Sequence, residues 1–142
     1  MATTVDILAQ REQEKKDFVN SMYLTAGMSY WGDMIKNFAP DQTERDYDAI
    51  PQSYTIIDMD YESINSEEIK VTLTPEELFD KFYEYAISLL KRNYETANIN
   101  RYFVEWAKNV VALDLDTAAC STDADIADCA VQHAIFGKQK YA

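Results

Sequence analysis

Three carboxylates stand at every second position of the stretch TIIDMDYE, residues 55–62: Asp58, Asp60 and Glu62. In an extended strand, side chains two residues apart lie on the same face, about 6.7 Å from each other. Such a row has three interpretations. It can hold a divalent cation, it can imitate the phosphates of a nucleic-acid strand, or it can be the solvated face of a strand.

The first interpretation is a metal-dependent enzyme. Asp58 and Asp60, together with Asp114 and Asp116, would then hold magnesium for phosphoryl chemistry. Against this, Lys70 is expected on the neighbouring strand opposite Asp60, where its ammonium group already balances the negative charge. We rank this interpretation third, and we expect neither a metal site nor a cofactor.

The second interpretation is an acidic mimic of nucleic acid that inhibits a protein which binds DNA or RNA. The spacing of outward residues on a strand is of the same order as the spacing of phosphates along one nucleic-acid strand. A dedicated mimic would be more acidic and would carry no lysine on this face, so mimicry is the alternative hypothesis. The candidate acidic interaction face consists of Asp58, Asp60, Glu62, Glu67 and Glu68.

The remaining reactive side chains form no catalytic motif. His133 is the single histidine, and Cys129 lies four residues before it on the same helical face. With Cys120 the spacing becomes C-x8-C-x3-H, which is not a zinc-ligand pattern. The three glycines cannot build a dinucleotide fingerprint or a P-loop, and no G-x-S-x-G element is present. We therefore expect packed residues here, no catalytic residues, and a protein that is not an enzyme.

The pattern around the acids predicts a β-hairpin over residues 54–73. Apolar and polar residues alternate over 55–62 and again over 69–73, with a turn between them. We predict that Tyr61 pairs with Ile69, so that Asp60 lies opposite Lys70 and the apolar residues of both strands share one face. The acids then face water, and helices cover the apolar face, because a lone hairpin is marginal in water.

The N-terminal segment predicts a helix over about residues 4–25, capped by Thr3 or Thr4. Its middle, residues 10–17, contains no large apolar residue and cannot be buried in the core of a monomer. We therefore expect this helix to project for contact with a partner. The aromatic and methionine residues that follow predict a break near Gly27 and a second helix that ends at Phe38, and residues 40–54 read as a loop.

Three further helices are predicted in the second half of the chain. The sequence TPEE at 74–77 combines a cap hydroxyl, a proline at the first helical position and a capping-box glutamate. Another helix follows the possible caps in NIN at 98–100. The last helix is capped by Ser121 or Thr122 and ends before Gly137. The fold class is therefore α+β and mainly α, with about five helices packed with one β-hairpin, in a single domain over residues 1–142.

The net charge limits the kinds of partner that the protein is expected to bind. The chain has 25 acids and 13 bases, which give a formal charge of −12. This charge repels nucleic acid and anionic membranes and attracts basic protein surfaces. No apolar run reaches the roughly 20 residues that a membrane helix requires. We expect a soluble, cytoplasmic protein with no direct binding to nucleic acid or membrane.

These patterns together favour a non-enzymatic interaction or assembly protein, such as an adaptor or a small structural subunit. Its partner would be a protein with a basic surface, or a second copy of the chain. The content of tyrosine and acid and the small size would suit a virus-encoded or mobile-element accessory protein. Aromatic residues are enriched at protein interfaces; the candidate partner-contact aromatics are Tyr23, Tyr30, Trp31 and Tyr47.

Overall fold

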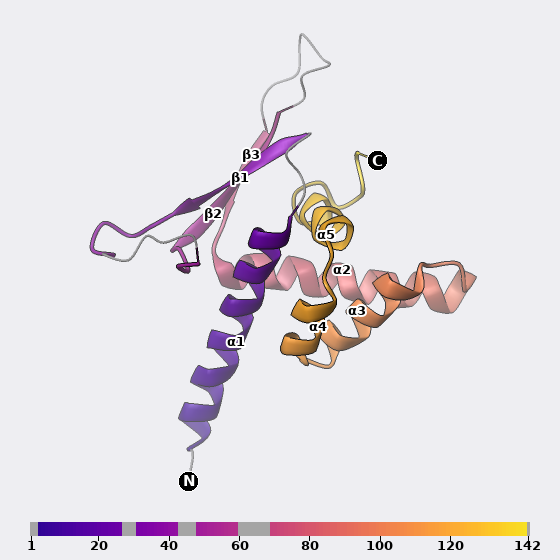
Figure 1. The fold of residues 1–142 in the computed structure, drawn as a ribbon, viewed down its shortest axis with the longest axis horizontal. Coiled ribbons are helices and arrows are strands. Elements are labelled where there is room, and N and C mark those ends of the chain that lie inside the picture. Colours follow the sequence, from indigo (N-terminus) through magenta and orange to yellow (C-terminus); the bar gives the residue numbers. More distant parts are fainter. Residues whose placement is uncertain (1–2, 27–30, 43–47, 60–68, 142) are drawn as a thin grey trace.

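The computed structural model describes residues 3–26, 31–42, 48–59 and 69–141. The elements follow in the order α1 (Thr4–Thr25), β1 (Gly32–Asn37), β2 (Ser53–Asp58), β3 (Ile69–Leu73), α2 (Pro75–Thr96), α3 (Arg101–Val111), α4 (Leu115–Ser121) and α5 (Ala124–Phe136). Figure 1 shows a small sheet at one end of a helical body. The predicted class, α+β and mainly α, is confirmed, with five helices in the part of the chain that the structure describes.

Local capping signals set the helix ends. Thr3 and Asp6 form a capping box at the start of α1. Thr74 and Glu77 form another at the start of α2, with a proline at the first turn as predicted. The N-cap of α5 is Asp123, whose carboxylate accepts from Ile126 N at 2.8 Å, so the prediction of Ser121 or Thr122 was wrong. Residue 121 instead ends the short helix α4, which the sequence pattern did not predict.

The N-cap of α2 should contribute measurably to the free energy of unfolding. The Thr74 hydroxyl accepts from Glu77 N at 3.2 Å, and the Glu77 carboxylate accepts from Thr74 N at 3.1 Å. Replacing Thr74 by alanine should therefore lower the free energy of unfolding by about 1 kcal/mol, and replacing it by serine should change it little. Urea unfolding of the two variants checks this. Equal losses for alanine and serine would contradict a role for the hydroxyl.

The sheet has three antiparallel strands in the order β1-β2-β3, so the described structure adds a strand to the predicted hairpin. Residues 32–37 are β1, and the predicted helix up to Phe38 was wrong. The run Gly32 to Asn37 is too short for its apolar pattern to separate a strand from a helix. Pairing with β2 decides the matter, with Met34 opposite Ile56.

The register between β2 and β3 also differs from the prediction. Asp58, not Tyr61, is the partner of Ile69, and Ile56 pairs with Val71. This is a shift of three residues, and an odd shift turns every side chain of a strand to the opposite face. Ile56 and Asp58 therefore lie on the buried face of β2.

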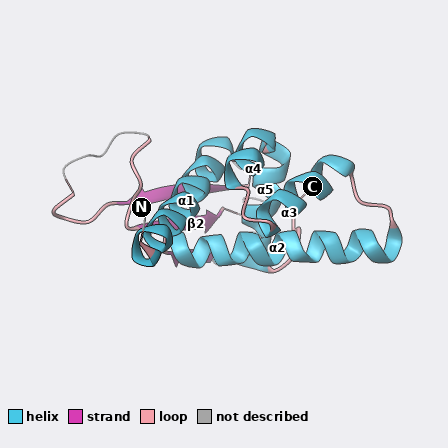
Figure 2. Cartoon of the chain, turned by 90° about the horizontal axis from the view of Figure 1, so that it is seen from below, coloured by secondary structure: helices cyan, strands magenta, loops and turns pink. Residues whose placement is uncertain are grey.

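The buried face of the sheet packs against the end of α1. The Tyr54 ring lies 5.7 Å from the ring of Tyr23, and the Tyr54 hydroxyl donates to Asn20 Oδ1 at 2.9 Å. The helical body is organised around α2, which contacts α1, α3 and α5. Figure 2 shows α2 running along the length of this body. None of the helices in the described ranges combines the length and apolar character needed to cross a bilayer.

Candidate functional site

The first half of α1 projects from the body (Figure 1). Buried residues of α1 begin only at Phe18, and residues 3–13 are all exposed. Three of these exposed residues are large and apolar: Val5 is 74% exposed, Ile7 49% and Leu8 60%. A short helical segment gains little stability in water without tertiary contacts. This part of α1 therefore presents apolar side chains that the described part of the chain leaves in solvent.

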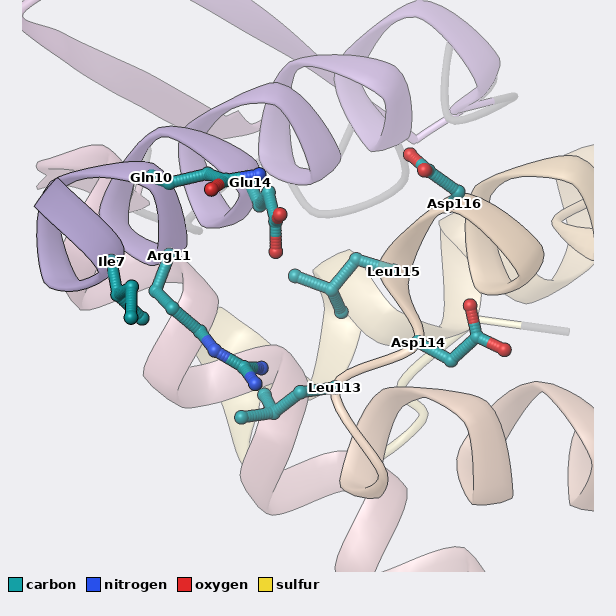
Figure 3. A pocket seen from close by; sticks show the side chains of 8 residues that line it. All are labelled: Ile7, Gln10, Arg11, Glu14, Leu113, Asp114, Leu115 and Asp116. Carbon is teal, nitrogen blue, oxygen red and sulfur yellow. The ribbon is translucent and has the colours of Figure 1, made fainter. Parts of the chain in front are cut away.

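A groove lies beside this segment, between α1 and the connection from α3 to α4. We name it the α1 groove; its volume is about 350 Å³. Its lining residues are Ile7, Gln10, Arg11, Glu14, Leu113, Asp114, Leu115 and Asp116. Figure 3 shows the Arg11 side chain reaching from α1 toward Leu113, with Ile7 beside it and Leu115 on the facing wall.

The lining of the α1 groove is mainly polar, with a negative balance of charge, and Ile7, Leu113 and Leu115 are its apolar residues. Glu14, Asp114 and Asp116 contribute three carboxylates, and Arg11 is the single base among the lining residues. Among the described residues, none of these four side chains forms an ion pair. The α1 groove therefore combines apolar contact area with carboxylates that remain available to cations.

The connection that forms the facing wall has an unusual backbone. Leu113 has a positive φ of 59°, the left-handed region that favours glycine. Hydrogen bonds hold it there, from Leu113 N to Val110 O at 3.0 Å and from Asp114 N to Asn109 O at 2.9 Å. Such conformations in residues other than glycine cluster at functional sites. A leucine side chain is thus kept on the groove wall at a position where glycine would be less strained.

A second polar cluster is buried under the segment that follows α5. Asp58 is 3% exposed; its carboxylate accepts from Lys140 Nζ and from the Tyr141 hydroxyl, both at 2.7 Å. The hydrogen bond to Asp58 raises the pKa of Lys140. The expectation that Asp58 faces solvent is therefore wrong, because the register of β2 turns it inward. Asp60, Glu62, Glu67 and Glu68 lie outside the described residues.

Trp31 belongs to the same cluster. Its Nε1 donates to Asp128 Oδ1 at 2.6 Å, and its ring stacks on Tyr141 at 5.4 Å. Gln132 donates to Asp128 Oδ2 at 3.2 Å, and its Oε1 accepts from Tyr141 N at 2.8 Å. We name this group of Asp58, Trp31, Asp128, Gln132, Lys140 and Tyr141 the Asp58 cluster. It fixes residues 140 and 141 on the body.

Two of the four predicted partner-contact aromatics, Trp31 and Tyr23, lie in the described part of the chain. Trp31 is buried in the Asp58 cluster, and Tyr23 is half-buried against Tyr54 with Lys36 Nζ 5.0 Å from its ring centre. Tyr30 and Tyr47 lie outside the described residues. The described structure therefore gives Trp31 and Tyr23 packing roles inside the fold.

The cysteines and the histidine lie on α4 and α5. Cys120 is exposed and Cys129 is half-buried. The His133 ring stacks on Tyr85 at 4.3 Å, and burial lowers its pKa. Burial also raises the pKa of the Cys129 thiol. Within the described ranges, no three His, Cys, Asp or Glu side chains gather in a way that could hold a metal ion.

Sequence reasoning expected α1 to project but missed the α1 groove. Val5 and Leu8 precede the polar block, and Leu8 stands seven and fourteen residues before Lys15 and Met22, on one face of the helix. This spacing could have shown that the core-facing stripe of α1 continues beyond the body. Nothing in the sequence places Ile7 and Arg11 in one groove with Leu113, because Leu113 lies about a hundred positions further along the chain.

Comparisons of this chain with models of protein families, with curated proteins and with solved structures found no match. The functional evidence is therefore the geometry of the molecule itself.

Proposed function

We propose that this protein is a non-enzymatic interaction protein that binds a basic, amphipathic segment of a partner protein. The observation that carries this proposal is the exposure of Val5, Ile7 and Leu8 on a projecting helix, beside a groove rich in carboxylates. A helix that lays an apolar stripe against a partner is a common mode of recognition.

The apolar contribution comes from the first turns of α1. Burying apolar surface stabilises a complex by about 25 cal/mol per Å² before the entropic cost of association. Val5 and Leu8 are three residues apart, so they lie on neighbouring positions of one helix surface. A partner that covers them removes apolar area from water and also stabilises the helical turns that carry them.

The electrostatic contribution favours a partner surface with positive charge. The carboxylates of Glu14, Asp114 and Asp116 outnumber the single guanidinium of Arg11 in the α1 groove. The whole chain carries a formal charge of −12. Both favour lysine or arginine on the partner, and long-range attraction of this kind mainly accelerates association.

The nucleic-acid-mimic hypothesis is not favoured by any described residue. Of its five acids, the described ranges contain only Asp58, which is buried and holds Lys140 and Tyr141. Self-association is the outcome in which the partner is a second copy, and the test below separates it from binding to another protein.

Replacing Leu8 by aspartate should weaken partner binding at least about tenfold, since it removes the burial of one leucine and adds an unfavourable charge. The matched control is Ile87→Asp, because Ile87 is an apolar residue on α2 that is 47% exposed and lies outside the α1 groove. Both variants should have the melting temperature of wild type, because each of the two residues already faces water.

The measurement is affinity capture from the native cell with wild type, Leu8→Asp and Ile87→Asp as baits. The expected result is a partner that wild type and Ile87→Asp retain, that Leu8→Asp loses, and that added salt releases. Light scattering over a range of concentrations shows whether wild type alone associates. Identical captured proteins for all three baits, with a monomer at every concentration, would refute the proposal.

A further inference from the structure

A second cavity lies apart from the α1 groove and shares no lining residue with it. It is formed by the second half of α2, the connection to α3, the start of α3, α5 and residue 139, and its volume is about 460 Å³. We name it the α2–α5 cavity. Cavities that bind small molecules measure about 300–1,000 Å³, so the α2–α5 cavity has the size for a small ligand.

About half of the lining of this cavity is apolar. Leu89 and Tyr85 are buried, Ile99 and Phe103 are partly buried, and the half-buried Cys129 completes this surface. Burial raises the pKa of the Cys129 thiol, so the sulfur is neutral at neutral pH and adds apolar contact. This lining suits an aliphatic or aromatic group.

The rim carries opposite charges on two different helices. Arg92 comes from α2 and Asp125 from α5, and both are exposed. Within the described residues neither forms an ion pair, so they do not neutralise each other across the opening. The other acid of the lining, Asp128, already accepts hydrogen bonds from Trp31 and Gln132. The cavity thus offers one available cation and one available anion above an apolar surface.

We infer that the α2–α5 cavity binds a small zwitterion with an apolar side chain, of the class of a free aromatic or branched aliphatic amino acid. Arg92 binds its carboxylate, for which the planar guanidinium can donate two hydrogen bonds. Asp125 binds its ammonium group. The side chain lies on Leu89 and Phe103.

The charges around the α2–α5 cavity favour a zwitterion over a ligand with a single charge. A ligand with only a carboxylate meets Asp125, Asp128 and the net charge of −12. A ligand with only an ammonium group leaves Arg92 without a partner and meets its positive charge. A zwitterion satisfies both rim charges and adds no net charge to an acidic protein.

Calorimetric titration of the full chain tests this with four named probes: L-phenylalanine, 3-phenylpropanoate, 2-phenylethylamine and glycine. L-phenylalanine should bind, and each of the other three should bind at least about tenfold more weakly, because each lacks one charged group or the side chain. The inference would be overturned if L-phenylalanine gave no heat of binding at about 10 mM ligand and L-leucine, titrated as a branched aliphatic amino acid, gave none either. Binding of either single-charge analogue with the affinity of the amino acid would also overturn it.

Variants of the rim assign each contact. Arg92→Gln should weaken binding of L-phenylalanine about tenfold and leave 2-phenylethylamine unchanged or slightly tighter. Asp125→Asn should do the same for L-phenylalanine and leave 3-phenylpropanoate unchanged or tighter. Lys91→Gln is the matched control, since Lys91 is exposed and does not line the cavity. Equal affinities for all three variants would overturn the assignment, and thermal melting confirms that each is folded.

Discussion

Replacing Trp31 by phenylalanine is expected to lower the free energy of unfolding by about 2–4 kcal/mol, whereas the same replacement at Trp106 should change it by less than about 1 kcal/mol. Both tryptophans are buried, at 2% and 0% exposure. They differ in the partner of the indole nitrogen. Trp31 Nε1 donates to the Asp128 carboxylate at 2.6 Å, and Trp106 Nε1 has no hydrogen-bond partner among the described residues.

The loss at Trp31 has two sources. A hydrogen bond to a charged group contributes about 1.5–3 kcal/mol, and its removal leaves one oxygen of a buried carboxylate without this donor. The smaller ring also contacts less of Tyr141, which stacks on Trp31 at 5.4 Å, and of Phe136 at 5.7 Å. The phenylalanine variant therefore weakens the Asp58 cluster as well as the core.

The two effects at Trp106 oppose each other. The smaller ring leaves a cavity between Phe18 and Tyr85, whose rings lie 6.3 Å and 5.9 Å from that of Trp106. Wild type also buries the Trp106 N–H without a partner, which destabilises its folded state by about 1–3 kcal/mol. The substitution removes this unfavourable term. Chemical denaturation of both variants gives the comparison. A double-mutant cycle with Asp128→Ala, which removes the acceptor, measures the coupling between Trp31 and Asp128, and equal losses for the two tryptophans would contradict the assigned role of the hydrogen bond.

A steep loss of stability above about pH 10 is the second large effect that we expect. Burial raises the pKa of Tyr54 and of Tyr85 well above the ordinary value for a phenol. The unfolded chain releases these protons near pH 10, while the folded chain keeps them. The folded state then binds more protons than the unfolded state, so stability is fully present below about pH 10 and falls as the pH rises toward the folded pKa values.

Other groups act in the same direction. The pKa values of Cys129, Lys140 and Tyr141 are also raised in the folded protein. Desolvation is the main cause for Cys129 and Tyr141, and the hydrogen bond to Asp58 is the main cause for Lys140. The thiol ionises first in the unfolded chain, so the decline should begin below the range of the phenols.

The Tyr54→Phe variant isolates the contribution of the Tyr54 phenol to this pH dependence from that of the other groups. At about pH 8 this variant should lose about 1 kcal/mol, because the hydroxyl no longer donates to Asn20. Above about pH 10 it should lose stability with pH less steeply than wild type, since it has one buried phenol fewer. Urea unfolding at a series of pH values measures both. Parallel curves for wild type and Tyr54→Phe would show that Tyr54 does not hold its proton in the folded state.

The sequence by itself determined the features that depend on near neighbours. The capping boxes at Thr3 and Thr74 join residues three positions apart, and the left-handed Gly137 ends α5 with a hydrogen bond to His133 O. The side chains and backbone groups involved are adjacent in the chain, so their types and spacing decide the result. The helix-rich class and the paired strands β2 and β3 followed from such patterns.

Only the tertiary structure decided which face each residue of β2 presents. Ile56 and Ile57 are adjacent and chemically alike, so the sequence offers two registers, and a shift by an odd number of residues exchanges the faces. The helices and residues 140 and 141 select the register that buries Asp58. The α1 groove and the α2–α5 cavity have the same origin. Each is formed by residues far apart in the chain, and local sequence patterns do not predict contacts between such residues.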